Sequence, residues 1–404
     1  MRRHPDVAHQ ARPRRRHVGL NELGAFAVDG RVPAEHVDAR REEDVVEAIR
    51  DANARRVALV LWGGGTRIGI GDAPARYDVA LDLRGLRGVV DHQPGDLTVT
   101  VRAGTTLAEL SAALAAHRQW WPVEAAHPER ATVGGTIASA ADGPSRYRYL
   151  HVRDHVIGVH AVLGDGTLTR AGGRVVKNVT GYDLSRLYSG TFGTLCAIVE
   201  ATLKLTPLPE RSETLIAESG DRASAVRLAR DLVRLRLPLD ALAVASGSPA
   251  RALGSSAAHA VLVRLAGNAA AVERLRRELA SRAPVTREVD ATVWQVLADA
   301  PADADVSLRA TWPPALAMDV DAGDAVLYVG LETAHLLAPL DARRIAELRA
   351  GAERREGALV VERAPSELRR SVGTWGTPRV PAAVAQRLRD AFDPNGVLAP
   401  GRVP

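Results

Sequence analysis

A glycine-rich turn that directly follows a buried strand restricts the fold more than any other feature. Residues 56–61 form a short apolar run typical of a buried strand, and Trp62-Gly63-Gly64-Gly65-Thr66-Arg67-Ile68-Gly69 follows at once. Backbone N–H groups in such a turn can cradle a phosphate. The spacing is neither G-x-G-x-x-G nor G-x-x-x-x-G-K-[ST], and residues 69–74 cannot begin the helix that both motifs require. A Rossmann site and a P-loop are therefore disfavoured, and a tight structural loop remains the alternative to a phosphate site.

Charge and hydropathy exclude two classes of protein. Lys and Arg number 53 against 48 Asp and Glu, and only Lys177 and Lys204 are lysines, so the arginines are spread among acids rather than gathered in one patch. No basic patch is interleaved with aromatics, which argues against a nucleic-acid binder. The basic residues 12–16 precede no apolar stretch, so no secretory or twin-arginine signal is expected. No apolar run approaches the ~18 residues of a spanning helix, and we predict no integral membrane segment.

Cysteine and histidine usage limits the metal and redox chemistry of the chain. Cys196 is the only cysteine, which excludes an internal disulfide, a Cys-rich zinc site and an iron–sulfur cluster held by this chain alone. A reducing cytoplasm fits this usage. His151 and His155 have a metal-ligand spacing, but they lead into a strand and lack the Glu of a zincin, so we assign them a structural role and predict no metal.

Hydrophobic periodicity predicts mixed helices and strands up to residue 208. The expected elements are a helix at 41–53, strands at 78–83 and 97–101, a helix opened by a capping box at 106–109, a hairpin at 156–170 and a long half-buried strand at 195–205. The proline-rich residues 206–209 end this pattern, because proline cannot continue an interior strand. We therefore expect a first domain at 31–208, preceded by a basic, flexible stretch at 1–30.

Beyond that boundary the pattern predicts a second α+β domain at 209–380. Strands are expected at 212–218, 240–246 and 259–265 and helices at 223–236 and 269–282, which is most of a split βαβ pattern. A last helix at 383–392 runs into Asp393-Pro394-Asn395-Gly396, a turn signal. Residues 381–404 are therefore treated as a separate C-terminal segment.

Two further segments combine small residues with possible ligand chemistry. Residues 131–140 place paired glycines among Thr and Ser, which suits close approach to a flat ligand, although a packed helix start is the commoner reading. In residues 172–187 a lysine is retained in a chain that otherwise uses arginine, which suggests a compact point charge in a tight pocket. Asp183 and Arg186 there could pair locally, or Tyr182 could reach a cofactor pocket, and the residues leave both readings open.

Together, five ordered motifs resemble the FAD-linked oxidases of the vanillyl-alcohol oxidase type, also called the PCMH-type FAD-binding fold. They are Gly-Gly-Gly-Thr at 63–66, Thr-x-Gly-Gly at 132–135, residues 153–158, residues 177–187 with 193–195, and residues 392–402. Within that group the chain is most similar to the FAD-binding E-type subunit of bacterial glycolate oxidases. The resemblance implies an α+β fold: a two-subdomain PCMH-type FAD-binding domain, a smaller ferredoxin-like cap domain, and a C-terminal segment that returns to the flavin domain.

The resemblance also implies which residues bind FAD. The diphosphate would lie over Gly63, Gly64, Gly65 and Thr66 with Arg67 alongside; the flavin and ribityl chain would contact Thr132, Gly134, Gly135, Thr136 and Ser139; the adenine would lie near Val152, Asp154, Val156 and Ile157; and Ile198 and Val199 would flank the flavin. Trp62 departs from the family, which usually carries Arg or another residue there. The glycine turn has no histidine and Cys196 falls within a strand, so non-covalent FAD is expected.

As a function, the resemblance implies the FAD-binding subunit of a glycolate oxidase-type dehydrogenase, which oxidises the CH–OH group of a small 2-hydroxy acid by hydride transfer to flavin N5. No catalytic residue is assigned. The last histidine is His335, so the His-x-Gly-Asp-Gly-Asn-x-His segment of catalytic relatives is missing. With one cysteine, the resemblance implies an iron–sulfur subunit and a catalytic flavoprotein subunit as partners. The expected location is the cytoplasm, with attachment to the inner membrane only through such partners.

Two alternatives stay open. The chain could be a stand-alone FAD oxidase or dehydrogenase of another alcohol or hydroxy acid, with a substrate arginine and base drawn from residues such as Arg309, Tyr328 and Arg379. It could also be a non-catalytic module that binds FAD for assembly or electron relay. The missing second-domain histidines favour the module.

Overall fold

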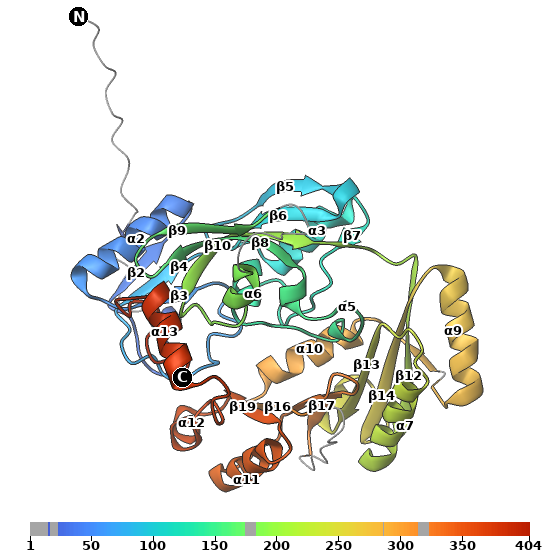
Figure 1. Cartoon of the computed structure of the whole chain (residues 1–404). Helices are drawn as coiled ribbons and strands as arrows, with labels where there is room; N and C mark the ends of the chain where they lie inside the picture. The colour runs from blue at the N-terminus through green and yellow to red at the C-terminus, as the bar shows by residue number, and fades with distance from the viewer. Residues whose placement is uncertain (1–14, 17–22, 174–182, 286, 314–322) are drawn as a thin grey trace, which may run out of the picture.

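The computed structural model describes residues 15–16, 23–173, 183–285, 287–313 and 323–404. Figure 1 shows two regions: an N-terminal region, coloured blue to green, lies above a sheet coloured yellow to red. The C-terminal helix α13 (Ala382–Phe392) lies beside the N-terminal region rather than beside that sheet. Lys177 and Tyr182 fall outside the described residues.

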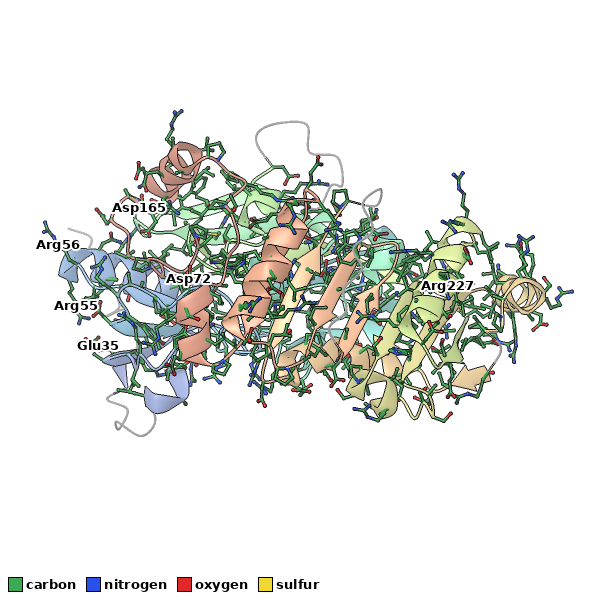
Figure 2. All side chains as sticks on the ribbon, turned by 90° about the horizontal axis from the view of Figure 1, so that it is seen from below. Glu35, Arg55, Arg56, Asp72, Asp165 and Arg227 are labelled. Carbon is green, nitrogen blue, oxygen red and sulfur yellow. The ribbon has the colours of Figure 1, made fainter. Side chains whose placement is uncertain are left out.

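A small mixed sheet carries the glycine turn. Its strands lie in the order β1 (Arg15–Arg16), β2 (Glu35–Asp38), β4 (Val79–Asp82) and β3 (Leu59–Trp62), with the last three parallel. The predicted helix is α2 (Glu42–Arg55), which connects β2 to β3 and buries Val45 and Ile49 against the sheet. Arg55 pairs with Glu35 of β2 on the surface (Figure 2). The turn therefore leaves the sheet at the carboxyl end of β3.

The second sheet is antiparallel, with the order β5 (Val89–Gln93), β6 (Thr98–Arg102), β10 (Cys196–Lys204), β8 (Val156–Leu163) and β9 (Leu168–Gly172). The predicted hairpin is confirmed by β8 and β9. The capping box is confirmed too: the Thr106 hydroxyl accepts from the Glu109 N–H at 3.1 Å, and the Glu109 carboxylate accepts from the Thr106 N–H at 2.9 Å. This box begins α3 (Leu107–Ala115).

Strand β10 departs from the predicted half-buried pattern. Its first residues are buried on both faces: Cys196 and Ile198 pack in the core under α3, whereas Ala197 and Val199 pack in the core shared with α2 and the first sheet. The half-buried prediction is wrong for these residues, because the strand lies between two apolar layers. A two-stranded ladder of β7 (Gln119–Trp120) and β11 (Thr206–Pro207) completes this region.

The third sheet is antiparallel and has eight strands. Its first half consists of β12 (Arg211–Ser219), α7 (Arg222–Arg234), β13 (Ala241–Ser246), β14 (His259–Gly267), α9 (Ala269–Arg282) and β15 (Arg287–Val289). The strand order β15-β12-β14-β13 and the β-α-β-β-α-β sequence are ferredoxin-like, as predicted.

The other half of this sheet was not predicted. Its elements are β16 (Ser307–Thr311), β17 (Ala325–Tyr328), β18 (Thr333–Leu336), α11 (Ala342–Glu353) and β19 (Ala358–Arg363), in the strand order β17-β18-β16-β19. Pairing of β13 with β17 joins the halves. Helices α7, α9 and α11 share one core, whereas α8 (Ser248–Ala252) and α10 (Val293–Asp303) cover the other face, and α10 lies toward the N-terminal region (Figure 1).

The predicted return of the C-terminal segment to the N-terminal region is confirmed. Leu398 forms a parallel bridge with Leu59 of β3, and the Leu59 N–H donates to the Val397 carbonyl at 2.7 Å. The Asp393 carboxylate accepts from the N–H groups of Val397 at 3.0 Å and Leu398 at 2.9 Å. The segment therefore completes the free edge of the strand that ends in the glycine turn.

Residues 23–30, which the sequence places in the N-terminal stretch, pack on the same sheet. The Phe26 ring lies edge-on to Trp62 with centroids 5.1 Å apart, and the Tyr77 hydroxyl donates to the Phe26 carbonyl at 2.8 Å. Within the ranges that the structure covers, no helix is long and apolar enough to cross a membrane.

A buried charge network joins the N-terminal region to the eight-stranded sheet. From β14, the Arg264 guanidinium donates to Glu124 at 2.6 Å, Asp240 at 2.8 Å and the Ser145 hydroxyl at 2.8 Å. Burial alone would raise the pKa of Glu124, but the charge of Arg264 outweighs it and holds that pKa below its ordinary value. Among the described residues, Glu124 forms an ion pair with Arg264 alone, whereas Asp240 also lies 3.6 Å from Nη1 of Arg148.

We predict that Arg264→Met destabilises the protein by about 3–5 kcal/mol, because it leaves buried Glu124 without its cation and Asp240 with only the more distant Arg148. The matched control is Arg282→Met on α9. The Arg282 side chain is 50% exposed and pairs with Glu278, so we expect this substitution to lower the free energy of unfolding by less than about 1 kcal/mol. Urea unfolding followed by tryptophan fluorescence compares the two. Equal shifts of the unfolding midpoint would contradict a role for the network.

Candidate FAD-binding site

The glycine turn packs directly on the segment before α4 (Val133–Ala138). A Cβ added to Gly63 would lie 2.4 Å from the Thr132 hydroxyl oxygen, and one added to Gly64 would lie 1.8 Å from the Arg130 carbonyl oxygen. Only glycine allows this approach. Thr132 in turn caps α4, since its hydroxyl accepts from the Gly135 N–H at 3.2 Å.

A cavity opens between the two glycine segments. The predicted FAD residues that line it are Gly63, Gly64, Gly65, Thr66, Arg67, Thr132, Gly135 and Ser139, and Phe192 and Arg402 complete it. The structure thus brings together residues that are about 70 positions apart in the sequence. Arg402, from the C-terminal motif at 392–402, also lines this cavity, although the sequence analysis did not place it here.

Other predicted FAD residues do not line this cavity. The Gly134 N–H donates to the Ala103 carbonyl at 2.8 Å, and the Val199 carbonyl accepts from the Ala103 N–H at 2.9 Å. Asp154 pairs with Arg186 at 2.9 Å. Also outside the cavity lining are Thr136, Val152, Val156, Ile157 and Ile198. Their contacts with FAD stay predictions.

Two buried donors of residues that line the cavity have no hydrogen-bond partner among the described residues: Nε of Arg67 and Nη1 of Arg402. The N–H groups of residues 63–66 likewise make no backbone hydrogen bond within the part of the chain that the structure covers. Buried donors are normally satisfied, and an anionic cofactor rich in acceptor oxygens would satisfy these. The residues present therefore fit the phosphate end of FAD.

Trp62, which departs from the family pattern, supports the turn from behind. Its indole N–H donates to the Tyr77 hydroxyl at 2.7 Å, and a Cβ on Gly65 would lie 3.2 Å from its ring. Gly65 also has a φ of +73°, which favours glycine. Trp62 is buried and its N–H is taken up by Tyr77, so it supports the turn by packing and is not part of the cavity lining.

A second cavity lies between the glycine turn and the eight-stranded sheet. The turn contributes Gly65, Thr66, Arg67, Ile68, Gly69 and Ile70; Asp142 lies on the N-terminal side; and the sheet contributes Tyr328, His335 and Glu362. Residues 65–68 line both cavities, so a ligand in the second cavity would adjoin a cofactor in the first.

One carboxylate organises the charges of the second cavity. Glu362 on β19, with its side chain 4% exposed, lies 3.1 Å from Nη2 of Arg67, 2.8 Å from Nε of Arg309 and 3.4 Å from Nδ1 of His335. Burial opposes ionisation of Glu362, but Arg67 and Arg309 outweigh it and hold its pKa well below the ordinary value. Glu362 thus links the glycine turn to the cap sheet.

Of the three candidate substrate residues named from the sequence, some lie near the second cavity and one does not. Tyr328 lines the second cavity, edge-on to His335 at 6.0 Å between centroids, whereas Arg309 is outside the lining and donates to its Glu362. Arg379 does not: its guanidinium is exposed and donates to the Glu356 carbonyl at 2.6 Å. Glu362 was missed, and its only sequence signal is a charge at the end of the apolar run of β19.

The two histidines considered as metal ligands have other contacts. Nε2 of His155 lies 2.5 Å from the Tyr149 carbonyl oxygen, and His151 lies 3.5 Å from Asp142. Across the described ranges, no group of three or more His, Cys, Asp or Glu side chains could hold a metal. Asp183 and Arg186 do pair locally, at 3.1 Å.

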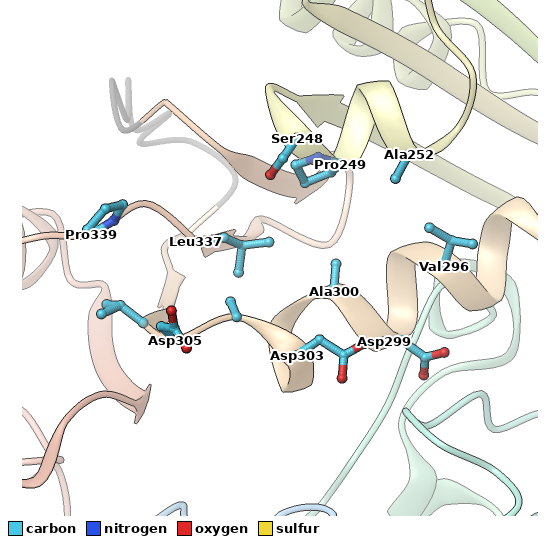
Figure 3. A pocket seen from close by; sticks show the side chains of 12 residues that line it. Ser248, Pro249, Ala252, Val296, Asp299, Ala300, Asp303, Asp305, Leu337 and Pro339 are labelled. Carbon is cyan, nitrogen blue, oxygen red and sulfur yellow. The ribbon is translucent and has the colours of Figure 1, made fainter.

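A third hollow, of about 510 Å³, lies apart from the glycine turn, between α8, α10 and the segment at 337–339 (Figure 3). Two of its carboxylates are engaged: Asp303 lies 3.1 Å from Nε2 of His127, and Asp299 accepts from the His127 N–H at 2.8 Å. These contacts attach α10 to the N-terminal region. Because Ala298, Pro301 and Ala302 of α10 line the second cavity, the same contacts also position that wall of the cavity.

Comparison with known proteins supports the assignment of this cavity to FAD. Residues 33–172 match the family described as FAD binding domain. These 140 residues are about a third of the chain. Among solved structures, p-cresol methylhydroxylase with substrate bound has a TM-score of 0.70 at 16% identity, covering 95% of this chain and 92% of that one. Alkyldihydroxyacetonephosphate synthase has a TM-score of 0.67 at 16% identity, covering 91% and 76%. The fold is therefore of the PCMH type.

Curated relatives are similar to about half of the chain. The glycolate oxidase subunit GlcE of Escherichia coli (strain K12) is 38% identical over 175 residues, 43% of this chain and 49% of that protein. The glycolate oxidase subunit GlcD of Bacillus subtilis (strain 168) is 29% identical over 206 residues, 51% and 44%. The D-lactate dehydrogenase of Archaeoglobus fulgidus is 30% identical, covering 50% and 45%. The matched region spans about half the length of these relatives.

We predict that Gly64→Ala abolishes FAD binding, or weakens it at least tenfold, because its Cβ would collide with the Arg130 backbone. Gly69→Ala is the matched control in the same turn: no atom lies within 4 Å of its Cβ position, and it should retain FAD. Flavin absorbance per mole of purified protein measures both. Full occupancy in Gly64→Ala would show that the turn does not hold the cofactor.

We predict that Glu362 stabilises the fold in a pH-dependent way. Its pKa is lowered on folding, so its contribution is present above the unfolded value of about 4.3 and is lost as the pH falls through the folded pKa. The thermal midpoint of Glu362→Gln should therefore lie well below wild type at pH 7, and the gap should narrow below about pH 4. Glu273→Gln on α9, whose side chain is 51% exposed, is the control, and its thermal midpoint should stay close to that of the wild type at both pH values. A gap independent of pH would contradict the ion-pair role.

Proposed function

We propose that this protein is the FAD-binding subunit of a glycolate oxidase-type dehydrogenase of small 2-hydroxy acids. The carrying observation is the glycine turn that packs on residues 130–135 and leaves unpaired donors around a cavity. The similarity to glycolate oxidase subunits supports the substrate class. FAD, when bound, supplies a hydride acceptor at N5 for the carbon that bears the hydroxyl group.

Non-covalent attachment of FAD is part of this proposal. No histidine or cysteine lines the cofactor cavity among the described residues. Cys196 is buried in β10, and burial raises the pKa of its thiol, which makes it a poor nucleophile. A flavin bound this way is released when the protein unfolds.

The charge balance of the second cavity supports a subunit that works with partners. A 2-hydroxy acid carries a carboxylate, and an active site normally meets it with an unpaired cation. Here Arg67 and Arg309 both contact Glu362, and the other arginine of the lining, Arg363, is exposed and donates to the Ala302 carbonyl at 3.0 Å. At Arg67 or Arg309, a substrate carboxylate would have to compete with a buried protein carboxylate. We propose a catalytic flavoprotein partner for substrate oxidation and an iron–sulfur partner for electron transfer, since one cysteine cannot hold a cluster.

A second candidate function has its own observation. Tyr328 and His335 line a cavity that adjoins the cofactor cavity, and Arg309 contacts its Glu362; this is where a stand-alone hydroxy-acid dehydrogenase would hold its substrate. In that case a hydroxy acid would displace Glu362 from one arginine. The location proposed for either function is the cytoplasm, with contact to the inner membrane only through partner subunits.

The deciding measurement is the visible spectrum of the chain purified alone. We expect a yellow protein that releases free FAD on denaturation and stays oxidised when glycolate or D-lactate is added without oxygen. Reduction should occur only after the partner subunits are added. Bleaching by the hydroxy acid with the chain alone would replace the subunit proposal by the stand-alone one, and a colourless protein that cannot be reconstituted with FAD would overturn both.

A further inference from the structure

We propose that Arg402 compensates the negative charge of the FAD diphosphate, so that the cofactor site is completed by a guanidinium from the C-terminal segment. The inference rests on the FAD-binding role proposed above and adds a residue to it. It is carried by the position of Arg402 in the cavity, by its hydrogen bonds and by its lack of a carboxylate partner.

Arg402 lines the same cavity as the glycine turn, and the whole residue is 2% exposed. Its Nη2 donates to the carbonyls of Ile68 and Ile70, which lie 334 and 332 residues earlier in the sequence. Its Nη1 is buried and has no partner among the described residues. One face of the guanidinium therefore holds the turn, and one donor remains available to a ligand.

The neighbouring Arg369 on α12 (Ser366–Val372) is a second buried arginine at the turn, and unlike Arg402 its charge is compensated by a carboxylate. Arg369 donates to the carbonyls of Gly69 and Gly71, so the two arginines together hold four successive carbonyls of the turn. Arg369 also forms an ion pair with buried Asp29. Its charge is thereby balanced inside the protein.

Arg402 has no such ion pair among the residues that the structure covers. Asp72 influences it electrostatically, but the Asp72 carboxylate accepts from the Thr374 N–H at 3.1 Å and forms no ion pair with Arg402. Burial and the charge of Arg369 lower the pKa of Arg402 to about 10, with Asp72 and Tyr77 acting in the opposite direction. A buried cation in this setting is costly until an anion enters the cavity.

The chemistry of the anion follows from the donors. A guanidinium forms strong, directed hydrogen bonds with phosphate oxygens, and the N–H groups of residues 63–66 line the same space. Arg67 also lines this cavity, but Glu362 already engages it. A diphosphate therefore meets one uncompensated cation and a row of backbone donors.

The test measures FAD affinity of the apoprotein by flavin fluorescence quenching. Arg402→Gln should raise the Kd for FAD by about 10- to 100-fold, the range of a charged hydrogen bond, and Arg402→Lys should recover part of the loss. The matched control is Arg387→Gln, an exposed arginine on α13, which should bind FAD within twofold of wild type. Circular dichroism confirms that each variant is folded.

Riboflavin separates charge compensation from a purely structural role, because it carries the same ring system without phosphate. Arg402→Gln should leave the affinity for riboflavin unchanged. Equal loss of FAD and riboflavin affinity would mean that Arg402 only holds the turn, and unchanged FAD affinity would mean that it does neither; each result overturns the inference while leaving FAD binding intact. Failure of wild type to bind FAD would overturn the proposed function as well.

Discussion

Close packing of the glycine turn on residues 130–132 is the constraint on which the site depends. A single methyl group on Gly64 would collide with the Arg130 carbonyl oxygen at 1.8 Å, so the two segments meet backbone to backbone. Such an approach needs each segment to be held from outside. Thr132 caps α4 on one side, and on the other side residues 397–399 pair with β3 and fix where the turn begins. The C-terminal segment is thus a structural part of the N-terminal region.

Buried charges connect this region to the cap sheet. Arg264 is held by carboxylates from both regions, and Glu362 lies between Arg67 of the turn and Arg309 of the sheet. Buried ion pairs contribute little net stability compared with apolar packing, because desolvation offsets their attraction, but they are costly to break. Their effect here is to fix one relative placement of the two regions, since any other placement would leave a charge unpaired.

Local features of the fold could be predicted from the sequence, whereas the polar site residues could not. The capping box at Thr106 and the hairpin at 156–170 depend on residues a few positions apart, and both were recovered. The burial of Cys196 and Ile198 depends on layers contributed by distant helices, so alternation alone misled. Glu362 and Arg402 act on residues 295 and 332 positions away, and no periodicity records such a pairing.

The two adjoining cavities differ in their balance of charge, and this difference has a functional consequence. In the cofactor cavity, Arg402 is buried without an ion-pair partner among the described residues. In the second cavity, Glu362 pairs with Arg67 and Arg309, Asp142 pairs with Arg146, and the remaining arginine of the lining, Arg363, is exposed, so the acids are matched by arginines. A site with an excess cation retains an anion, whereas a matched site gives a small anion little net attraction. The arrangement favours tight retention of a phosphorylated cofactor over capture of a carboxylate substrate, which supports the subunit role that we propose.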